Sequence, residues 1–256
     1  MRTNVAREGR TMSDEHTVLL LGSTGRTGSH VVSQLLERGV EVRAVVRSAG
    51  RLPEGAGGRP GLTVIEADLL SLSDEDLRGL VQGCDAVISC LGHNITLKGM
   101  FGAPRDLVTR AATRICQAIE ELHPAKAVKF ILMSSVSVNQ PAGRDTRRGQ
   151  FEKAVVALLR GVIPPANDNQ RAADFLCNDV GTANPFVEWV AVRPDSLLEG
   201  DVSEYTLHKG LVSSLARPDS TNRANVAHFM CELVETPQAW DDWRCGLPVI
   251  VNVASK

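Results

Sequence analysis

The sequence predicts an α/β protein built on a doubly wound parallel sheet. Apolar, strand-like runs alternate with stretches of helical period along the chain, which is typical of repeated βαβ units. The first run, residues 17–21, is continuously apolar after Thr17, as a strand covered on both faces should be. A chain of 256 residues can bury one sizeable core, so we expect a single domain over residues 15–256.

The first half of the chain predicts most of the sheet. Short apolar runs predict strands over residues 17–21, 42–46, 62–66, 86–89 and 128–133. A helix is expected over residues 27–38, where positions 31, 32, 35 and 36 are apolar and Gly39 is a natural stop. The helix expected over residues 105–122 has the clearest apolar stripe, formed by Leu107, Val108, Ala111, Ile115, Ile119 and Leu122.

The second half predicts a strand over residues 187–192 that ends in Arg193 and Pro194, a helix over 222–234 and a last strand over 248–253. Two segments break the alternation. Residues 141–186 hold two helical patterns separated by two prolines, and residues 195–221 are irregular. Ligands of open α/β sheets bind beyond the carboxyl ends of the strands. Both segments leave or return near that edge, so we expect them to form a small substrate lobe there.

Composition excludes several classes of function. The formal net charge of −2 gives no basic surface for nucleic acid or anionic lipid. The six cysteines have no CxxC spacing, which argues against a metal site and favours reduced thiols in a cytoplasmic protein. No apolar run is long enough for a membrane span. Residues 1–14 are polar, without the apolar core of a secretory signal, and are expected to be a disordered lead.

The motif with the clearest chemistry is Gly22-Ser-Thr-Gly-Arg-Thr-Gly28, directly after the first strand and at the start of a helix. Gly22 permits a tight turn, Gly25 lets the backbone approach a pyrophosphate, and Gly28 allows close packing of helix and strand. The helix offers free N–H groups to phosphate. Hydroxyl donors come from Ser23, Thr24 and Thr27. The loop predicts dinucleotide binding on a Rossmann-type sheet.

The residue after the second strand indicates which dinucleotide. An NAD site usually has Asp or Glu there to hold the ribose 2′-hydroxyl, whereas this chain has Arg47. A guanidinium forms forked, charge-assisted bonds to a phosphate, and Arg26 could approach the same 2′-phosphate from the phosphate loop. NADP(H) is therefore expected in preference to NAD(H). The alternative is that Arg47 is an ordinary solvated surface charge.

The GxxGxxG spacing resembles that of the extended and atypical short-chain dehydrogenase/reductases. The resemblance covers most of the chain and includes residues 66–68, 85–92, 134–135 and 189–194. It is greatest to the atypical branch with NmrA-like and biliverdin-reductase-B-like proteins. It implies that Asp68 and Leu69 border the adenine and that Cys90, Leu91 and Gly92 pass near the ribose. It also implies that Met133, Ser134 and Pro194 line the nicotinamide side.

The same resemblance implies a Tyr-xxx-Lys pair after the fifth strand, with a nearby serine as its partner. Ser135 stands at the serine position, but Ala166 and Gln170 align where the tyrosine and lysine belong. The single tyrosine, Tyr205, has a lysine four residues later, yet it follows the sixth strand and is a better candidate for a substrate pocket. The family's proton-transfer mechanism therefore cannot be carried over.

Other candidates for a substrate pocket are His93, Asn94, Asp168 and Asn169. These residues also have a purely structural interpretation. His93 and Asn94 would then simply form the turn after the fourth strand, and Asp168 would cap a helix over residues 169–177 that begins at Asn169. The glycine-rich loop of residues 92–104 could fold over a bound cofactor.

Three functions remain open from sequence. The first is an NADPH-dependent oxidoreductase acting on a small carbonyl or conjugated substrate. The second is a non-catalytic, NmrA-like NADP(H) sensor that binds a protein partner. The third, an epimerase or dehydratase on a nucleotide sugar, would need the absent tyrosine. The helices expected over 105–122 and 151–160 could pair in a homodimer.

Overall fold

The computed structural model describes residues 16–52, 58–92, 104–140, 163–214 and 217–253, together with a few residues between 149 and 158. Residues 1–14, His93 and Asn94 lie outside this part of the chain, as does most of the loop expected to act as a lid.

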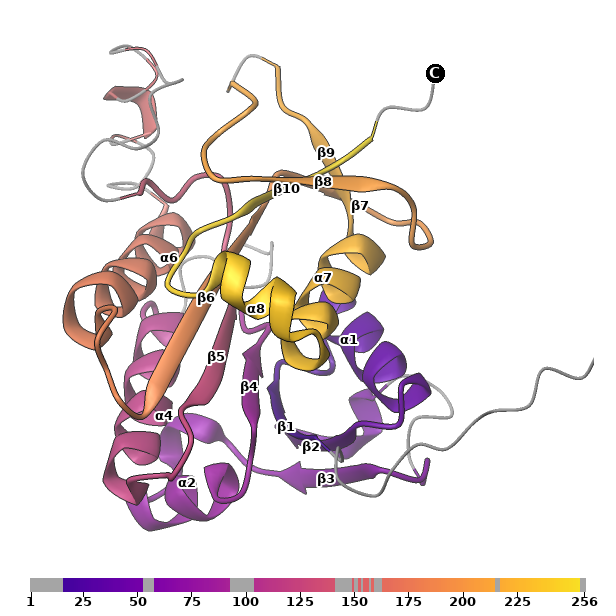
Figure 1. The fold of residues 1–256 in the computed structure, drawn as a ribbon, viewed down its shortest axis with the longest axis vertical. Helices are drawn as coiled ribbons and strands as arrows, with labels where there is room; N and C mark the ends of the chain where they lie inside the picture. Colours follow the sequence, from indigo (N-terminus) through magenta and orange to yellow (C-terminus); the bar gives the residue numbers. More distant parts are fainter. Residues whose placement is uncertain are drawn as a thin grey trace, which may run out of the picture.

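The architecture is an eight-stranded sheet in the order β3-β2-β1-β4-β5-β6-β10-β8 (Figure 1). Only β8 runs antiparallel to its neighbour in this sheet. The strand order reverses between β1 and β4, which pair with one another and lead to opposite halves of the sheet. The strands are β1 (Thr17–Leu21), β2 (Glu41–Val46), β3 (Leu62–Glu66), β4 (Ala86–Ser89), β5 (Val128–Met133), β6 (Val187–Pro194), β8 (Tyr205–His208) and β10 (Val249–Asn252).

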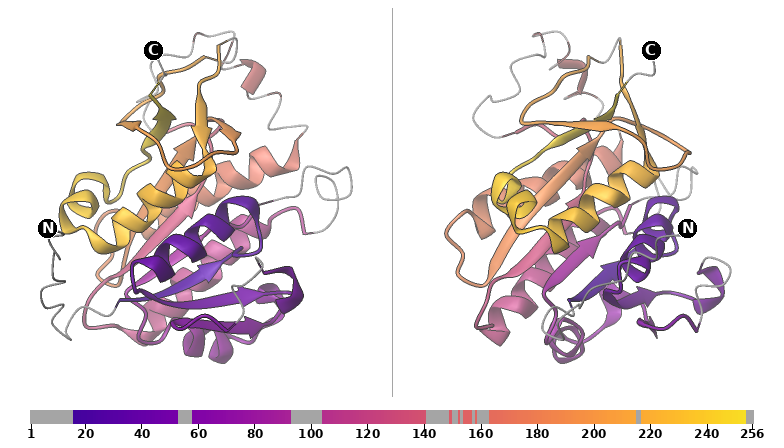
Figure 2. Two further views of the ribbon diagram at one scale, coloured as in Figure 1. Left: turned by 90° about the vertical axis from the view of Figure 1, so that its right-hand side faces the viewer. Right: turned by 45° about the vertical axis from the view of Figure 1, so that its right-hand side comes forward.

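Helices cover both faces of the sheet (Figures 1 and 2). One core holds side chains of α2 (Asp74–Val81), α4 (Leu107–Leu122) and α6 (Pro164–Phe175). The other holds those of α1 (Arg26–Glu37), α7 (Arg223–Glu235) and α8 (Pro237–Trp243). Strand β1 supplies both cores: Leu19 and Leu21 face the first, Val18 and Leu20 the second. This two-sided burial explains its uninterrupted apolar run.

The predicted Rossmann-type class is confirmed, and the seven predicted strands lie within two residues of their expected ends. The prediction that residues 195–221 are irregular is wrong. They contain β8 and a separate two-stranded parallel sheet of β7 (Ser196–Leu198) and β9 (Ser220–Asn222). These short strands are stabilised by partners far along the chain, so local sequence gives little sign of them.

The helix predicted over residues 169–177 begins earlier, at Pro164. Proline suits the first turn of a helix, where its missing N–H costs nothing. The residue before the helix is Ile163, so the prediction that Asp168 caps this helix is wrong. Helix α2 was not predicted, although Ser73 and Asp76 form a capping box that is readable in the sequence.

The apolar stripe of α4 is buried within the monomer against α2, α6 and the sheet. That face is therefore not available for a homodimer. No helix in the described residues is long and apolar enough to span a membrane.

Candidate functional site

A cavity of about 500 Å³ opens at the carboxyl ends of β1 to β4, where the strand order reverses. This is the place where open α/β sheets bind ligands. The predicted cofactor residues that line it are Gly22, Thr24, Gly25, Arg47, Asp68, Leu69, Cys90, Leu91 and Gly92. Arg51, Pro104, Leu107 and Arg110 line it as well and were not predicted. The structure thus brings together residues that the sequence spreads over four βα connections.

The glycines of the phosphate loop lie where larger residues would not fit. Gly22 has a φ of +79°, and a Cβ on it would lie 2.6 Å from the carbonyl oxygen of Cys90. A Cβ on Gly28 would lie 2.1 Å from the carbonyl oxygen of Gly22. Gly25 lines the cavity, and its N–H donates to the Gly22 carbonyl at 3.0 Å. The first and third glycines close the turn, and the second leaves room for a phosphate.

The start of α1 is suited to an anion. Gly25 precedes the helix, and no side chain caps it. The N–H groups of its first turn are therefore available to a ligand. Thr24 is exposed at the cavity, whereas Ser23 and Thr27 are buried beneath the loop. The oxygen of the Ser23 side chain has no hydrogen-bond partner among the described residues.

Two arginines line the cavity at the end away from the phosphate loop. Arg47 directly follows β2, and Arg51 ends the 3₁₀ turn Ala49–Arg51. Both are exposed and line the cavity. The two nearby carboxylates hydrogen-bond to backbone N–H groups and, among the described residues, form no ion pair with these arginines. Glu66 accepts from the N–H of Ala49 at 3.0 Å, and Asp68 caps the 3₁₀ turn Leu69–Ser71. Arg51 could have been predicted from its position close behind Arg47.

The expected nicotinamide side lies at the carboxyl ends of β5 and β6. The N–H of Ser134 donates to the carbonyl of Val192 at 2.7 Å, and that of Val136 to the carbonyl of Pro194 at 3.1 Å. These bonds place Met133, Ser134 and Pro194 next to one another, beside the cavity rather than in its lining. The hydroxyl groups of Ser135 and Ser137 are 2.5 Å apart and stabilise the turn that follows β5.

Gln170, which the resemblance aligns with the family lysine, has a structural role here. The side chain of Gln170, on α6, accepts from the N–H of Asn139 at 2.8 Å and donates to its carbonyl at 3.3 Å. It also donates to Asp174 at 2.8 Å. Gln170 therefore holds the loop after β5 against α6.

The comparison with known families agrees with this geometry. Residues 22–237 match the NAD(P)H-binding family. The chain belongs to this family. Its match begins at the first glycine of the phosphate loop and ends after α7, so it includes every predicted cofactor residue.

Two curated proteins illustrate what this NAD(P)H-binding protein is similar to in sequence. An uncharacterized chloroplastic protein of Arabidopsis thaliana is 28% identical over 217 residues, which are 80% of this chain and 73% of that protein. Cinnamoyl-CoA reductase 2 of Medicago truncatula is 38% identical over 127 residues, 48% of this chain. The match spans only 35% of that reductase.

Solved structures share the fold at low identity. A protein of Lactobacillus casei superposes with a TM-score of 0.68 at 21% identity, over 93% of this chain and 100% of that one. A putative NADH-flavin reductase of Streptococcus pneumoniae gives a TM-score of 0.63 at 18% identity, over 93% and 100%. These likenesses show that the NAD(P)H-binding protein has the Rossmann-type fold.

Asp168 lies on α6 but stabilises another helix. Its carboxylate, 1% exposed, accepts from the N–H groups of Val108 and Thr109 at 2.8 and 3.0 Å, and from the Thr109 hydroxyl at 2.6 Å. These are the first-turn donors of α4, so Asp168 satisfies the N-terminus of a helix about 60 residues earlier. The neighbouring Asn169 is half-buried on α6.

We expect Asp168→Asn to lower the free energy of unfolding by about 1–2 kcal/mol, because a single neutral amide oxygen replaces the charged carboxylate that accepts from the Val108 and Thr109 N–H groups. Affinity for NADPH should not change. Thermal unfolding and a cofactor titration measure the two effects, with Asp179→Asn, an exposed carboxylate near the same helix, as control. Weaker cofactor binding at unchanged stability would assign Asp168 to the ligand site instead.

Tyr205 lies on the edge strand β8, away from the cavity lining. Its hydroxyl hydrogen-bonds to Nδ1 of His228 on α7 at 2.9 Å, and burial raises its pKa to about 12. The lysine four residues later, Lys209, lines a different cavity. The structure therefore does not bring the Tyr205–Lys209 spacing to the dinucleotide site.

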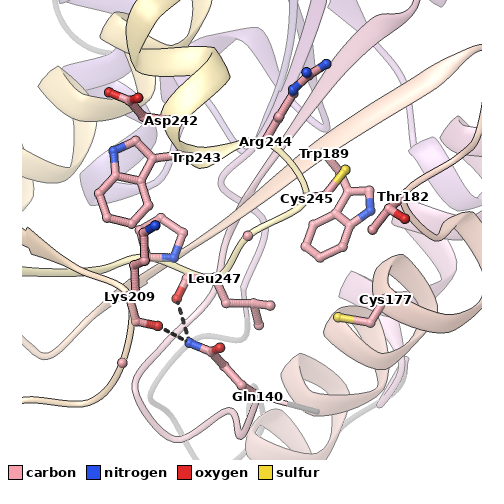
Figure 3. A pocket seen from close by; sticks show the side chains of 13 residues that line it. Gln140, Cys177, Thr182, Trp189, Lys209, Asp242, Trp243, Arg244, Cys245 and Leu247 are labelled. Carbon is pink, nitrogen blue, oxygen red and sulfur yellow. Dashed lines mark hydrogen bonds between the residues drawn. The ribbon is translucent and has the colours of Figure 1, made fainter. Parts of the chain in front are cut away.

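That second cavity, of about 640 Å³, lies beside β6 (Figure 3). Trp189, near the amino end of β6, forms one wall and Trp243, at the end of α8, another. Figure 3 shows the Gln140 side chain between the backbones of Lys209 and Leu247, whose carbonyl groups it hydrogen-bonds. None of the predicted site residues lines this larger cavity, and it is not formed by the phosphate loop.

The described residues contain no group of three His, Cys, Asp or Glu side chains that could hold a metal ion. Burial raises the pKa of Cys90, the thiol at the dinucleotide cavity, to about 12, so it stays protonated at neutral pH.

Proposed function

We propose that this protein binds NADP(H) in preference to NAD(H) and acts as a reductase of a small carbonyl or conjugated substrate. The observation that carries the proposal is Arg47 at the carboxyl end of β2, in the lining of the cavity together with Arg51. An NAD site needs an acceptor for the 2′-hydroxyl at this position, whereas two guanidinium groups suit a 2′-phosphate. Glu41, the acid of this strand, lies at its opposite end.

Three groups of residues would each hold a different part of such a cofactor. The backbone of Gly22–Gly28 would hold the pyrophosphate, Arg47 and Arg51 the 2′-phosphate, and Asp68 and Leu69 would border the adenine. When bound, the reduced cofactor supplies a hydride. The ends of β5 and β6 position the substrate for it, and the Ser135 hydroxyl can donate to a substrate oxygen. The resemblance aligns Gln170 with the family lysine, and its amide is bonded to the Asn139 backbone, so no Tyr-Lys pair delivers the proton. Water or the substrate itself supplies it instead.

A second candidate function is an NADP(H) sensor that binds a protein partner. It is favoured by one observation: the position of the family lysine is occupied by Gln170, whose amide is used to hold a loop. A protein of this kind would bind the cofactor tightly and would not consume it.

Turnover separates the two candidates. We expect NADPH to be oxidised above background with at least one member of a panel of quinones, flavins and aldehydes. Tyr205→Phe should retain this activity, because Tyr205 contacts α7 and not the cavity. Tight NADPH binding without turnover, together with co-purification of a protein partner, would support the sensor and overturn the reductase.

A further inference from the structure

The amino ends of α1 and α7 lie side by side next to the phosphate loop. The two helices pack side by side (Figure 2). They run in the same direction: Gln34 donates to the carbonyl of Ala224 near the start of α7 at 3.1 Å, and Arg38, four residues later, donates to Glu232, eight residues further along α7, at 2.7 Å. This packing brings Arg26 and His30 of α1 close to Arg223, the first residue of α7.

A single carboxylate lies among these three side chains. Glu199, which follows β7, forms ion pairs with Arg26 and, at 3.2 Å, with Nη1 of Arg223. Nε2 of His30 lies 4.0 Å from the other carboxylate oxygen. Two guanidinium groups thus face one carboxylate, and the cluster retains an excess of positive charge.

Arg223 is the most buried member of the cluster, and the carboxylate satisfies it only in part. Its side chain is only 9% exposed, yet its buried Nη1 has no hydrogen-bond partner within the described residues, although a Glu199 oxygen lies 3.2 Å away. Burial, with a smaller contribution from the charge of Arg26, lowers the pKa of Arg223, and Glu199 offsets this in part. A buried guanidinium with an unused donor favours a further or better-placed oxyanion.

The segment that carries Glu199 is held by other contacts. Asn222 donates to the carbonyl of Asp201 at 3.1 Å, and Asn225 accepts from the N–H of Ser203 at 2.8 Å. Gly200 has a φ of +152° and packs against the Asn222 side chain, which leaves no room for a Cβ. The Glu199 side chain can therefore move away while its backbone stays attached to α7.

We propose that Arg26, His30 and Arg223 form an oxyanion subsite beside the phosphate loop, which Glu199 fills in the free protein and yields to an oxyanion of the bound ligands. The oxyanion is either the cofactor's pyrophosphate or a carboxylate or phosphate of the substrate. The subsite itself stands on the cluster's geometry, and only its role in catalysis rests on the function proposed above.

The energies allow this exchange. The Arg26–Glu199 pair is exposed, with 65% and 54% of the two side chains accessible, and exposed ion pairs contribute little. An oxyanion can accept from two guanidinium groups at once, and the cofactor's pyrophosphate as a whole carries two negative charges where the Glu199 carboxylate carries one. Removing the Glu199 charge should therefore tighten oxyanion binding by about threefold to tenfold.

Calorimetric titration of the full chain tests the proposal. Wild type, Glu199→Gln and Glu204→Gln are titrated with NADPH, and then, free or saturated with NADPH, with inorganic phosphate and with malonate. Glu204 is exposed further along the same segment, so its variant changes the net charge equally and controls for it. Arg26→Gln and Arg223→Gln, each in the Glu199→Gln background, should abolish the gain, and thermal unfolding confirms that each variant is folded.

If Glu199→Gln binds NADPH more tightly than Glu204→Gln does, the subsite belongs to the cofactor. If it binds phosphate or malonate more tightly when both variants are saturated with NADPH, the subsite belongs to the substrate. The proposal is overturned if Glu199→Gln binds no probe more tightly than Glu204→Gln does. Should wild type fail to bind NADPH at all, the proposed function fails, while phosphate binding to the free protein still decides the subsite.

Discussion

Gly28→Ala is expected to abolish detectable NADPH binding and to lower the free energy of unfolding by about 1–3 kcal/mol. The added Cβ would lie 2.1 Å from the Gly22 carbonyl oxygen and 3.0 Å from the Ser23 Cα. Because all of these atoms belong to backbone, no side-chain rotation relieves the clash. The phosphate loop must therefore move, and its N–H groups lose their alignment towards a pyrophosphate.

Calorimetry with NADPH and thermal unfolding measure both effects of Gly28→Ala. Gly79→Ala is the matched control, because Gly79 lies within α2, where an added Cβ would meet only open space and alanine favours a helix. The control should bind NADPH normally and be slightly more stable. Normal NADPH affinity in Gly28→Ala would show that the loop does not hold the cofactor.

Arg47→Gln is expected to weaken NADPH binding by about tenfold to a hundredfold, the effect of losing one charge-assisted contact to a phosphate. NADH affinity should stay the same, because a 2′-hydroxyl gains little from a guanidinium. Arg51→Gln should add to the effect, since both arginines line the same end of the cavity.

Selectivity, the ratio of the two affinities, is the quantity to compare for Arg47→Gln. Arg171→Gln serves as control, because Arg171 is exposed on α6 and does not line the cavity. An equal loss of NADPH and NADH affinity would mean that Arg47 supports the shape of the site rather than reading the 2′-phosphate.

Much of the sheet was predictable, because its central strands are buried on both faces. The run at residues 18–21 is fully apolar for that reason, and the glycine loop between it and the following helix has a spacing that suits a pyrophosphate-binding turn. Among the residues of the cavity, the glycines and Arg47 followed from their positions directly after the first and second strands, whereas Asp68, Leu69 and the residues from Cys90 to Gly92 followed from the family resemblance.

The features that were not predicted depend on contacts between distant parts of the chain. Asp168 resembles a local helix cap in sequence, and only the packing of α6 on α4 directs its carboxylate to Val108 and Thr109. Glu199 likewise has no sequence motif, because its partners Arg26 and Arg223 come from the starts of two different helices. Arg26, expected near the 2′-phosphate, does not line the cavity with Arg47.

The central claim is that the cavity at the ends of β1 to β4 binds NADP(H) in preference to NAD(H). Separate titrations of wild-type protein with NADPH and with NADH, at the same ionic strength, test it most directly. The two arginines predict a dissociation constant for NADPH at least about tenfold lower than for NADH. Equal affinities, or tighter binding of NADH, would contradict the claim.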